Sequence, residues 1–354
     1  MEAGSGGHLV LVRLSALGDV VMVLPLLQAL RVQYPNLRLS LVSQPFAEDL
    51  VSTVPGVEFM PARVRDRHRG IRGIWRLARS ICRVDRTARV ADLHQVLRSR
   101  ILLLFIRILR FPRWVQAATI RKGRREKRLL VRGAIHRQLE HSVERYAEVV
   151  ARLGYPVEIP YRLGGLPLRP LPESLESLLH TGKGAIGIAP FAKHRAKMYP
   201  TARMLEVAQS LQRNGYRLFL YGGGAQEVAT LQEWARGLPG AVVVPGLGLR
   251  LGQELQLMAR MQVVVSMDSA NMHLASWAGV PVVSIWLATH PNAGFLGWGQ
   301  SLANVVARGD LDCRPCSIFG NKPCKRGDYA CGDIAPVVVV ERVMGNVKRD
   351  KPIE

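Results

Sequence analysis

The chain has 354 residues, 48% of them hydrophobic, and carries a formal net charge of +22. This length and apolar content are enough for two ordinary hydrophobic cores, and they exclude a mainly disordered chain. Residues 1–7 lack the order of charged and apolar residues that is typical of a secretory signal. The most apolar stretch, 101–111, contains two arginines and is far shorter than the roughly 20 apolar residues of a membrane span. We therefore expect a cytoplasmic protein.

Apolar strands alternate with helices along the chain, which predicts an α/β protein built from doubly wound sheets. In the first half we expect strands at 8–13, 37–42, 57–60 and 88–93, and helices at 20–34, 71–82, 93–110 and 132–153. A Pro- and Gly-rich passage at 155–172 is typical of a linker. The pattern then restarts, with strands at 185–189, 217–221, 241–244, 263–266 and 280–285 and helices at 201–214, 226–235, 252–260 and 274–279. We expect domains at 1–165 and 166–335, followed by a C-terminal helix and tail at 336–354.

Most of the positive charge lies in residues 61–140, which hold 23 Lys and Arg against 5 Asp and Glu. Such a region attracts a polyanion, which is nucleic acid, anionic lipid or a phosphorylated substrate. Residues 93–110 form a basic amphipathic pattern that suits either a membrane surface or a core helix with arginines on a solvated rim. Nucleic acid ranks below the others, because the sequence has no recognition-helix, zinc-finger or RNA-binding signature.

Two of the expected buried strands in the second half are followed by residues that suit a nucleotide site. Asp268 and Ser269 come directly after one of them, where the N–H groups of the next helix attract a phosphate or a ribose hydroxyl. His273, one turn further on, either reinforces this site or is a core histidine. Gly222 and Gly223 follow another strand and either let the backbone approach a nucleotide closely or form a flexible turn.

The first turn argues against NAD chemistry. A dinucleotide site has G-x-G-x-x-G after the first strand, whereas residues 14–19 read LSALGD, with a single glycine. Asp19 in this turn suits a general base that accepts a proton from a hydroxyl nucleophile. Its alternative role is to cap the helix that follows.

Several short motifs occur in a characteristic order. The first turn has the form S-x-x-G-D-V, a later loop reads K-M-Y-P, and the apolar strand ends in D-S-x-x-x-H-x-A. A looser T-x-P run with a later glycine follows at 289–297. Over about 280 residues this order resembles glycosyltransferase family 9, the lipopolysaccharide heptosyltransferases that use ADP-heptose. The chain departs from the family pattern at Tyr199, usually tryptophan, and at Ala270, usually glycine.

The resemblance implies a GT-B fold, which is two Rossmann-like domains with a cleft between them. It implies an inverting transferase that moves a heptose or related sugar from an ADP-sugar to a phosphorylated lipid A or inner-core lipopolysaccharide acceptor. No metal or other cofactor is implied. The enzyme would be peripheral to the cytoplasmic face of the inner membrane and would not bind nucleic acid. The alternatives are a transferase that uses another nucleotide sugar, or a noncatalytic basic α/β protein that binds RNA or anionic membrane.

The resemblance also assigns roles to residues of this chain. Asp19 becomes the general base, and Lys197 stabilises the charge that develops on the leaving diphosphate. Glu227 is a candidate partner for a ribose hydroxyl. The expected donor-binding residues are Ser15, Gly18, Gly222, Gly223, Glu227, Asp268, Ser269, Ala270 and His273. The expected acceptor-binding residues are the basic run Arg121, Lys122, Arg124 and Arg125, whose alternative is a solvated basic helix.

Four cysteines lie within 19 residues near the C-terminus, at Cys313, Cys316, Cys324 and Cys331. This spacing allows a structural zinc site, but it lacks the second C-x2-C pair of a zinc ribbon. Disulfides are disfavoured in a cytoplasmic chain. In either case we expect the segment to order a loop near the active site and not to carry the reaction.

Overall fold

The computed structural model describes residues 6–180 and 182–347. The chain divides into two compact units, of which the first comprises Met1–Lys122 and Ser142–Pro160 and the second comprises Gly123–His141 and Tyr161–Glu354. Residues 123–141 thus group with the second unit, although the sequence placed them in a first domain that ends at 165. Long-range hydrogen bonds explain this, because the Leu139 N–H donates to the Asn292 carbonyl at 2.8 Å and a ring nitrogen of His141 lies 2.6 Å from the Leu296 carbonyl.

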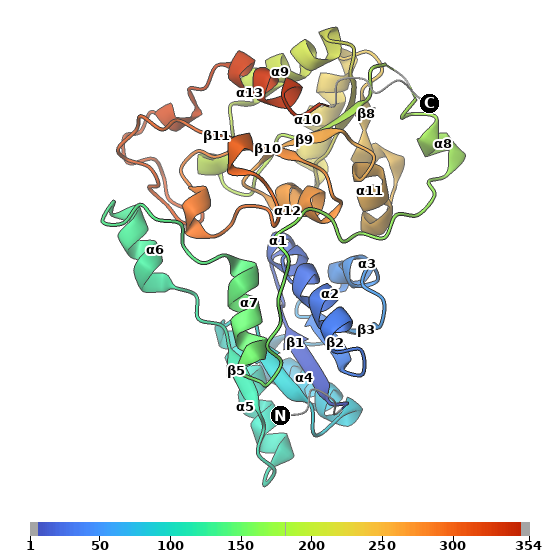
Figure 1. Ribbon diagram of the computed structural model, residues 1–354, viewed down its shortest axis with the longest axis vertical. Helices are drawn as coiled ribbons and strands as arrows, with labels where there is room; N and C mark the ends of the chain where they lie inside the picture. Colours follow the sequence, from blue (N-terminus) through green and yellow to red (C-terminus); the bar gives the residue numbers. More distant parts are fainter. Residues whose placement is uncertain (1–5, 181, 348–354) are drawn as a thin grey trace. The chain divides into compact units, whose positions relative to one another are not determined.

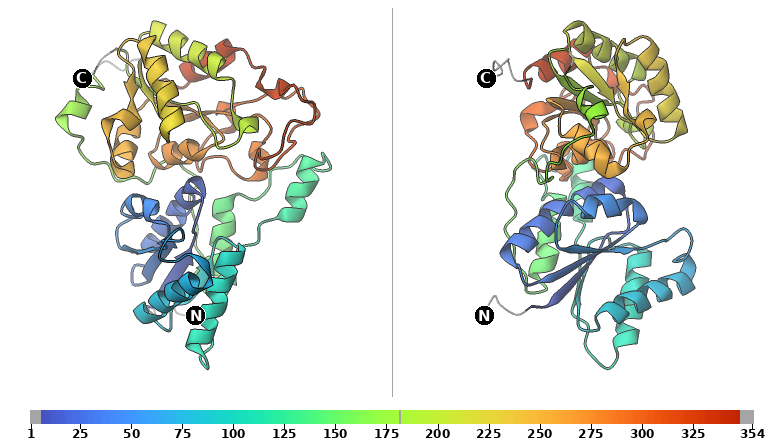
Figure 2. Two further views of the ribbon diagram at one scale, coloured as in Figure 1. Left: turned by 180° about the vertical axis from the view of Figure 1, so that it is seen from behind. Right: turned by 90° about the vertical axis from the view of Figure 1, so that its right-hand side faces the viewer.

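The first unit contains a five-stranded parallel sheet with the strand order β3-β2-β1-β4-β5. Its strands are β1 (His8–Val12), β2 (Arg38–Ser43), β3 (Val57–Pro61), β4 (Arg89–Asp92) and β5 (Ala117–Thr119). Its helices are α1 (Leu17–Val21), α2 (Leu24–Gln33), α3 (Glu48–Val51), α4 (Gly70–Val84), α5 (Leu97–Arg110) and α7 (Ser142–Ala151). Helices α4 and α5 cover one face of the sheet, and α2 and α7 lie on the other (Figures 1 and 2).

The apolar runs of the sequence explain this double coverage. Val10 and Val12 of β1 belong to the same core cluster as Ile74 of α4 and Leu102 of α5. Every residue of β1 is buried, including those that point to the opposite face. A strand that is buried on both sides is mostly apolar, which is why such runs predict parallel sheets.

The second unit contains a six-stranded parallel sheet with the strand order β11-β10-β9-β6-β7-β8. Its strands are β6 (Ala185–Ala189), β7 (Arg217–Leu220), β8 (Val242–Val243), β9 (Val263–Met267), β10 (Val282–Ile285) and β11 (Val305–Val306). Its helices are α6 (Arg124–Val131), α8 (Glu173–Glu176), α9 (Thr201–Arg213), α10 (Ala225–Arg236), α11 (Leu251–Met258), α12 (Ala270–Trp277) and α13 (Pro336–Met344). The main core of this unit joins α9, α10 and α13 to β6, β7, β9 and β10. The expected C-terminal helix is α13, and the last part of the expected tail, 348–354, lies outside the described residues.

Several expected helices have different bounds in the structure. The helix expected at 132–153 is only α7, because the chain turns back at 132–141 after the separate helix α6. The helix expected at 20–34 is divided into α1 and α2, with Pro25 in the first turn of α2. Helix α5 begins at Leu97 because the Asp92 carboxylate accepts the N–H groups of His94 and Gln95, which hold this passage in a turn.

Over residues 6–180 and 182–347, we find no helix with the length and apolar character needed to cross a bilayer.

Candidate active site

In each sheet the chain first adds strands on one side of its first strand and then adds the later strands on the other side. In the first unit the reversal lies between β1 and β4, because the chain runs from β1 to β2 and β3 and then returns to the other side of β1. In the second unit it lies between β6 and β9. Open parallel sheets bind ligands at the carboxyl ends of the strands beside such a reversal. The loops that follow these four strands are therefore where a site is expected in each unit.

In the second unit, Lys197 and Asp268 meet at this reversal. Lys197 belongs to a short 3-10 turn (Arg195–Lys197) after β6, and Asp268 is the first residue after β9. The Lys197 Nζ lies 2.8 Å from the Asp268 Oδ2, and the two side chains are 16% and 7% exposed. A largely desolvated pair of this kind fixes the position of the ammonium group, because either charge alone would be costly to bury. The structure thus brings together two site residues that are 71 positions apart.

The loop that carries Lys197 is held by the segment that carries the cysteines. Gly320 has a φ of +68°, and a Cβ added there would lie 2.3 Å from the Lys197 Cγ, so only glycine allows this close approach. The Ala288 N–H donates to the Ala196 carbonyl at 3.1 Å, and the Cys316 N–H donates to the Ala288 carbonyl at 3.1 Å. The aliphatic chain of Lys197 therefore packs against Gly320, and backbone hydrogen bonds hold the loop that precedes it.

Ser269 is the N-cap residue of α12 and has an extended backbone. Its Oγ lies 3.3 Å from the Ser266 Oγ. The helix begins at Ala270, four residues earlier than expected, so its first N–H groups follow Asp268 and Ser269 directly. His273 is a buried residue of this helix. The arrangement places the positive end of a helix beside the Lys197 ammonium, which suits an anionic group such as a diphosphate.

Gly222 and Gly223 lie just beyond the carboxyl end of β7, the neighbour of β6 on the side away from β9. A Cβ at Gly222 would lie 3.0 Å from a methyl carbon of Leu231, whereas one at Gly223 would meet open space. The Glu227 Oε2 accepts the Gly223 N–H at 2.8 Å. Glu227 therefore shapes the turn in this structure, and a ribose hydroxyl would have to share or replace that hydrogen bond.

In the first unit, Asp19 lies in the first turn of α1 and pairs with Arg13, which follows β1. The Arg13 Nη2 contacts the Asp19 Oδ2, and the Ala16 N–H donates to the same oxygen at 3.1 Å. The Asp19 side chain is 31% exposed, whereas that of Arg13 is 9% exposed. Asp19 thus stays accessible to a substrate while a buried guanidinium orients it.

Arg13 is itself held by the backbone of the neighbouring strand ends. Its Nε donates to the Ser15 carbonyl at 2.8 Å, its Nη1 donates to the Leu93 carbonyl at 2.6 Å, and its guanidinium lies 5.8 Å from the ring centre of Tyr146. Gly18 precedes Asp19 in the first turn of α1. Because the guanidinium is held at the ends of β1 and β4, it fixes the position of the Asp19 carboxylate relative to these strands.

His94, which follows β4 and contacts this turn, is a residue that the sequence did not single out. A ring nitrogen of His94 lies 3.5 Å from the Ser15 Oγ. Burial, followed by the positive charges of Arg13 and Lys122, lowers the pKa of His94 to about 4. His94 is therefore neutral near neutral pH. The signal available in the sequence was its place directly after the buried strand 88–93, the same type of position that identified Asp268.

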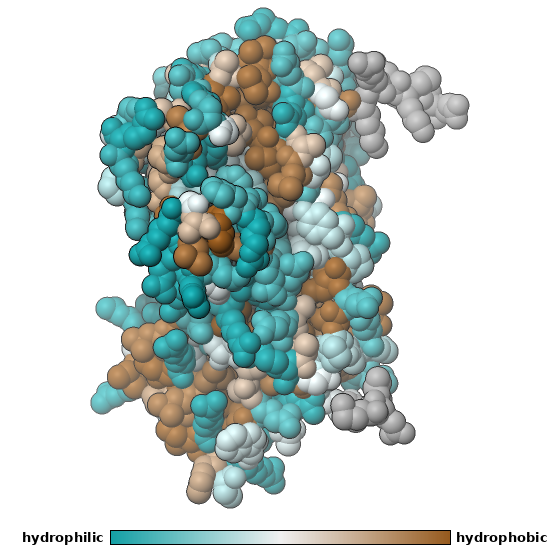
Figure 3. Space-filling view, turned by 60° about the vertical axis from the view of Figure 1, so that its left-hand side comes forward, coloured by the Kyte–Doolittle hydropathy of each residue, from teal (hydrophilic) through white to brown (hydrophobic). Residues whose placement is uncertain are grey.

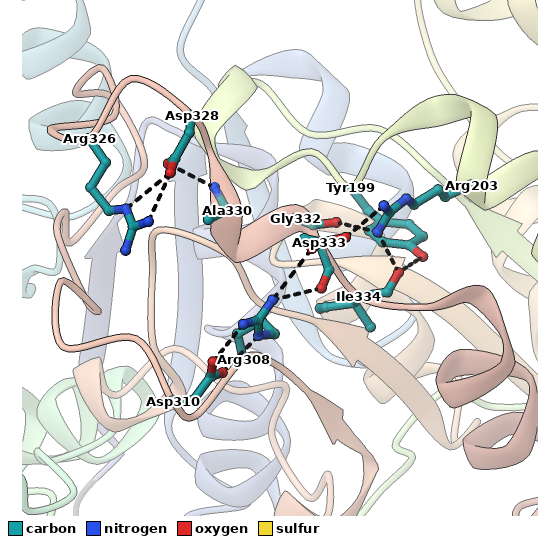
Figure 4. Close-up of polar contacts among 10 residues, drawn as sticks. All are labelled: Tyr199, Arg203, Arg308, Asp310, Arg326, Asp328, Ala330, Gly332, Asp333 and Ile334. Atoms are coloured by element: carbon teal, nitrogen blue, oxygen red, sulfur yellow. Dashed lines mark hydrogen bonds and ion pairs between the residues drawn. The ribbon is translucent and has the colours of Figure 1, made fainter.

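A network of ion pairs fixes the segment that carries the four cysteines (Figure 4). Arg203 of α9 pairs with Asp333 at 2.6 Å, and Arg326 pairs with Asp328 at 2.9 Å. The Tyr199 hydroxyl donates to the Ile334 carbonyl at 2.5 Å. Burial raises the pKa of Tyr199 to about 12, so this hydroxyl keeps its proton. The tyrosine that departs from the family pattern thus has a role as a hydrogen-bond donor, which ties the lysine loop to the end of the cysteine segment.

Cys313 and Cys324 are partly exposed, Cys316 and Cys331 are buried, and all four are free thiols. Burial raises the pKa of both Cys316 and Cys331. Across the described ranges, no group of three or more His, Cys, Asp or Glu side chains is arranged to hold a metal ion. The structure therefore gives no support to the zinc site that the spacing allowed.

The basic run that the sequence assigned to the acceptor is divided between the units. Arg121 and Lys122 end the first segment of unit one, whereas Arg124 and Arg125 begin α6 in unit two. The Arg121 guanidinium lies 3.5 Å from Glu148 and is 73% exposed, and Arg124 and Arg125 are also exposed. Each unit thus contributes two of these four residues.

Comparisons with known proteins agree with this fold. A family model described as glycosyltransferase family 9 (heptosyltransferase) matches residues 74–322. Lipopolysaccharide heptosyltransferase 1 of Pseudomonas aeruginosa is 26% identical over 326 residues, which make up 87% of this chain and 86% of that protein.

Two solved structures resemble this one along nearly the whole chain. The family 9 glycosyltransferase of Veillonella parvula has a TM-score of 0.72 at 19% identity, with 96% of this chain and 97% of that chain covered. The ADP-heptose lipopolysaccharide heptosyltransferase II of E. coli has a TM-score of 0.66 at 20% identity, with 96% and 98% covered. The predicted GT-B fold, with two parallel-sheet α/β domains, is confirmed.

Proposed function

Because this chain belongs to glycosyltransferase family 9, we propose that it transfers a heptose from ADP-heptose to the inner core of a lipopolysaccharide acceptor. We further propose that the anomeric carbon is inverted and that no metal ion is needed. The names of the relatives support this substrate class, because one is a lipopolysaccharide heptosyltransferase and another is named for ADP-heptose. The units divide the work in this proposal, with the donor on the second and the acceptor hydroxyl on the first.

The observation that carries the proposal is the Lys197–Asp268 pair at the reversal of the second sheet. When the bond between the sugar and the diphosphate breaks, the electron pair goes to a diphosphate oxygen. An ammonium group already in place stabilises that charge without a reorganisation cost. Asp268 keeps Lys197 at the strand end, and the N–H groups at the start of α12 supply further positive potential. In this proposal the Lys197 ammonium and the first N–H groups of α12 take the place of a divalent ion beside the departing diphosphate.

Asp19 is the proposed general base. The acceptor hydroxyl loses its proton to the carboxylate while its oxygen forms a bond to the anomeric carbon, opposite the departing diphosphate. This in-line displacement inverts the configuration. Arg13 orients Asp19 through its contact with Oδ2, and neutral His94 lies beside Ser15 in the same turn. Arg13 and His94 act through other groups and are positioning residues.

The remaining assignments concern binding. We propose that Gly222, Gly223 and Ser269 lie against the nucleotide and that Glu227 exchanges its Gly223 hydrogen bond for a ribose hydroxyl. Ala270 and His273 belong to the same helix as the Ser269 cap, and Ser15 and Gly18 belong to the Asp19 turn. The exposed side chains of Arg121, Arg124 and Arg125, together with Lys122, are proposed to meet acceptor phosphates.

The test is a transfer assay with purified protein, ADP-heptose and a lipopolysaccharide truncated before its core heptoses. We expect ADP release that depends on the acceptor and continues in excess EDTA. ADP should compete with the donor, whereas UDP should compete weakly. Release that requires a UDP-sugar would replace the donor assignment, and an Asp19→Ala variant with full activity would remove the proposed base.

A further inference from the structure

The outward face of α5 carries an apolar stripe. Leu97, Leu104 and Ile108 are 75%, 52% and 53% exposed, although they belong to a helix that covers a sheet. With 3.6 residues in each turn, these three positions fall within about 40° of one another around the helix axis. An outward helix face in a globular protein is normally polar. The stripe therefore requires an explanation other than the core of the first unit.

The core contacts of α5 are made by other residues. Leu102 and Ile106 are fully buried against the sheet and α4, and the ring of Phe105 meets Trp75 of α4 edge-on at 5.0 Å. The helix is thus apolar on two sides, and only one of them is needed for folding. The sequence left open a membrane-surface helix and a core helix with arginines on a solvated rim, and α5 packs in the core while its outward face is apolar as well.

The apolar stripe continues past the end of α5. Phe111 and Trp114 follow the helix and are 82% and 92% exposed. Figure 3 shows apolar side chains interspersed with hydrophilic ones at the lower left, over the part of the first unit that contains α4 and α5. An exposed phenylalanine and tryptophan at the end of a basic helix are typical of segments that enter the interface of a bilayer.

Arginines flank the stripe. Arg100 and Arg107 are exposed on α5, and Arg113 lies between the two aromatic residues. A cavity of about 430 Å³ opens beside the C-terminal ends of α4 and α5. Its lining residues are Arg79, Cys82, Arg83, Val84, Asp85, Arg86 and Leu109. Three guanidinium groups against one carboxylate give this cavity a positive potential that suits a phosphate group.

We propose that this α5 surface, defined by Leu104, Ile108, Phe111 and Trp114 with Arg83 and Arg107 beside them, docks on an anionic phospholipid bilayer. The apolar residues enter the interface, and the arginines bind lipid phosphates. The inference deepens the proposed function and rests on it in one respect, namely that an acceptor with a lipid anchor is reached at a membrane surface.

The charges favour a bilayer over other occupants. A second copy of the chain, packed through this surface about a twofold axis, would bring arginines against arginines. Nucleic acid would meet the arginines through its phosphates, but it would gain little from the aliphatic side chains of Leu104 and Ile108. An anionic bilayer matches both features, because it offers an apolar layer below a layer of phosphates.

The test is co-sedimentation of the full-length protein with vesicles of equal parts phosphatidylcholine and phosphatidylglycerol. We expect the protein to bind these vesicles and to bind pure phosphatidylcholine vesicles much more weakly. The Phe111→Ser/Trp114→Ser variant should partition at least about tenfold more weakly. The matched control is Val32→Ser/Leu302→Ser, which changes side chains that are 75% and 59% exposed elsewhere and should bind as the unchanged protein does.

A charge series gives a second, independent readout. Arg83→Glu/Arg107→Glu should abolish the preference for phosphatidylglycerol, whereas Arg213→Glu/Arg236→Glu, the same change at exposed sites on α9 and α10, should weaken it only slightly. The tryptophan emission should shift to the blue on binding, and this shift should be lost in Trp114→Phe.

Several results would overturn the docking surface. One is that the unchanged protein does not bind the vesicles. Another is that Phe111→Ser/Trp114→Ser and the control Val32→Ser/Leu302→Ser bind them equally. A change of oligomeric state or of RNA binding in the serine variant, with vesicle binding intact, would assign the surface to a second copy or to nucleic acid. Docking and sugar transfer fail separately, because transfer to a soluble, delipidated acceptor should be unchanged in Phe111→Ser/Trp114→Ser.

Discussion

The Lys197–Asp268 pair offers the sharpest test of the proposed site. Lys197→Met keeps the aliphatic chain that packs on Gly320 and removes the charge, so that Asp268, at 7% exposure, is left without its ammonium partner. Removing one partner of a buried pair costs about 3 to 5 kcal/mol, and because Lys197 remains 16% exposed we expect about 3 kcal/mol for either Lys197→Met or Asp268→Asn. The double variant should cost less than the sum by about 2 kcal/mol, because neither group is then left as an isolated charge.

Urea unfolding followed by circular dichroism measures these free energies. The matched control is the Arg326–Asp328 pair of the same unit, whose atoms are 2.9 Å apart but whose side chains are 51% and 46% exposed. Solvent screens such a pair, so a double-mutant cycle with Arg326→Met and Asp328→Asn should give a coupling close to zero. Equal couplings for the two pairs would refute the reasoning from burial.

The same variants test catalysis. If Lys197 stabilises the departing diphosphate, Lys197→Met should lower kcat by about 10²- to 10³-fold with little change in the KM for the acceptor. Asp268→Asn should give a smaller loss, because it leaves the ammonium in place but less firmly held. An unchanged kcat in Lys197→Met would show that other groups carry the developing charge.

Four further outcomes follow from the structure. Asp19→Asn should lower kcat at least about 10²-fold while calorimetry shows unchanged ADP binding, and weakened ADP binding would instead make Asp19 a donor ligand. Tyr199→Phe removes the hydrogen bond to the Ile334 carbonyl and should lower the free energy of unfolding by about 1 kcal/mol in urea, whereas an unchanged midpoint would show that water replaces the hydroxyl. Gly320→Ala should lower kcat because the new Cβ would lie 2.3 Å from the Lys197 Cγ, and full activity would show that the loop can move aside. The pKa of His94 is about 4 in the folded protein and ordinarily 6.5, so the unfolded chain binds the proton first as the pH falls. The free energy of unfolding should therefore decrease as the pH falls through this range. Thermal unfolding between about pH 7 and pH 5 should show a less steep decrease in His94→Gln.

The sequence predicted the strands well where they are buried on both faces. Residues 185–189 and 263–266 are continuous apolar runs, and the structure has β6 at Ala185–Ala189 and β9 at Val263–Met267. Because polar residues after such runs must lie at the strand ends, Asp268 could be singled out before its contact was known, whereas Lys197 was assigned through the resemblance to the family. Their 2.8 Å ion pair follows from the adjacency of β6 and β9, which no local pattern encodes.

Other features depend on contacts between distant parts of the chain. Arg13 ends an apolar run and gave no sign that its guanidinium would bind Asp19 and the Leu93 carbonyl. The helix expected at 132–153 was wrong in its first ten residues, because this part turns after α6 and then forms hydrogen bonds with Asn292 instead of helical ones. For α5, periodicity predicted an amphipathic helix but could not show that Leu104 faces solvent while Leu102 faces the sheet.

Residues 123–141 belong to the second unit although they precede the end of the first, and this affects how the two units fold during synthesis. Gly294 has a φ of +80°, and a Cβ there would lie 2.4 Å from the Glu140 carbonyl oxygen, so this early segment and a much later one are packed too tightly for any other residue. As the ribosome completes the first half, residues 123–141 must wait for partners about 150 positions downstream. A single cut in the chain therefore cannot separate the two units. A fragment that ends at 160 would contain residues 123–141 without their packing partners, and a fragment that starts at 161 would lack these residues of the second unit.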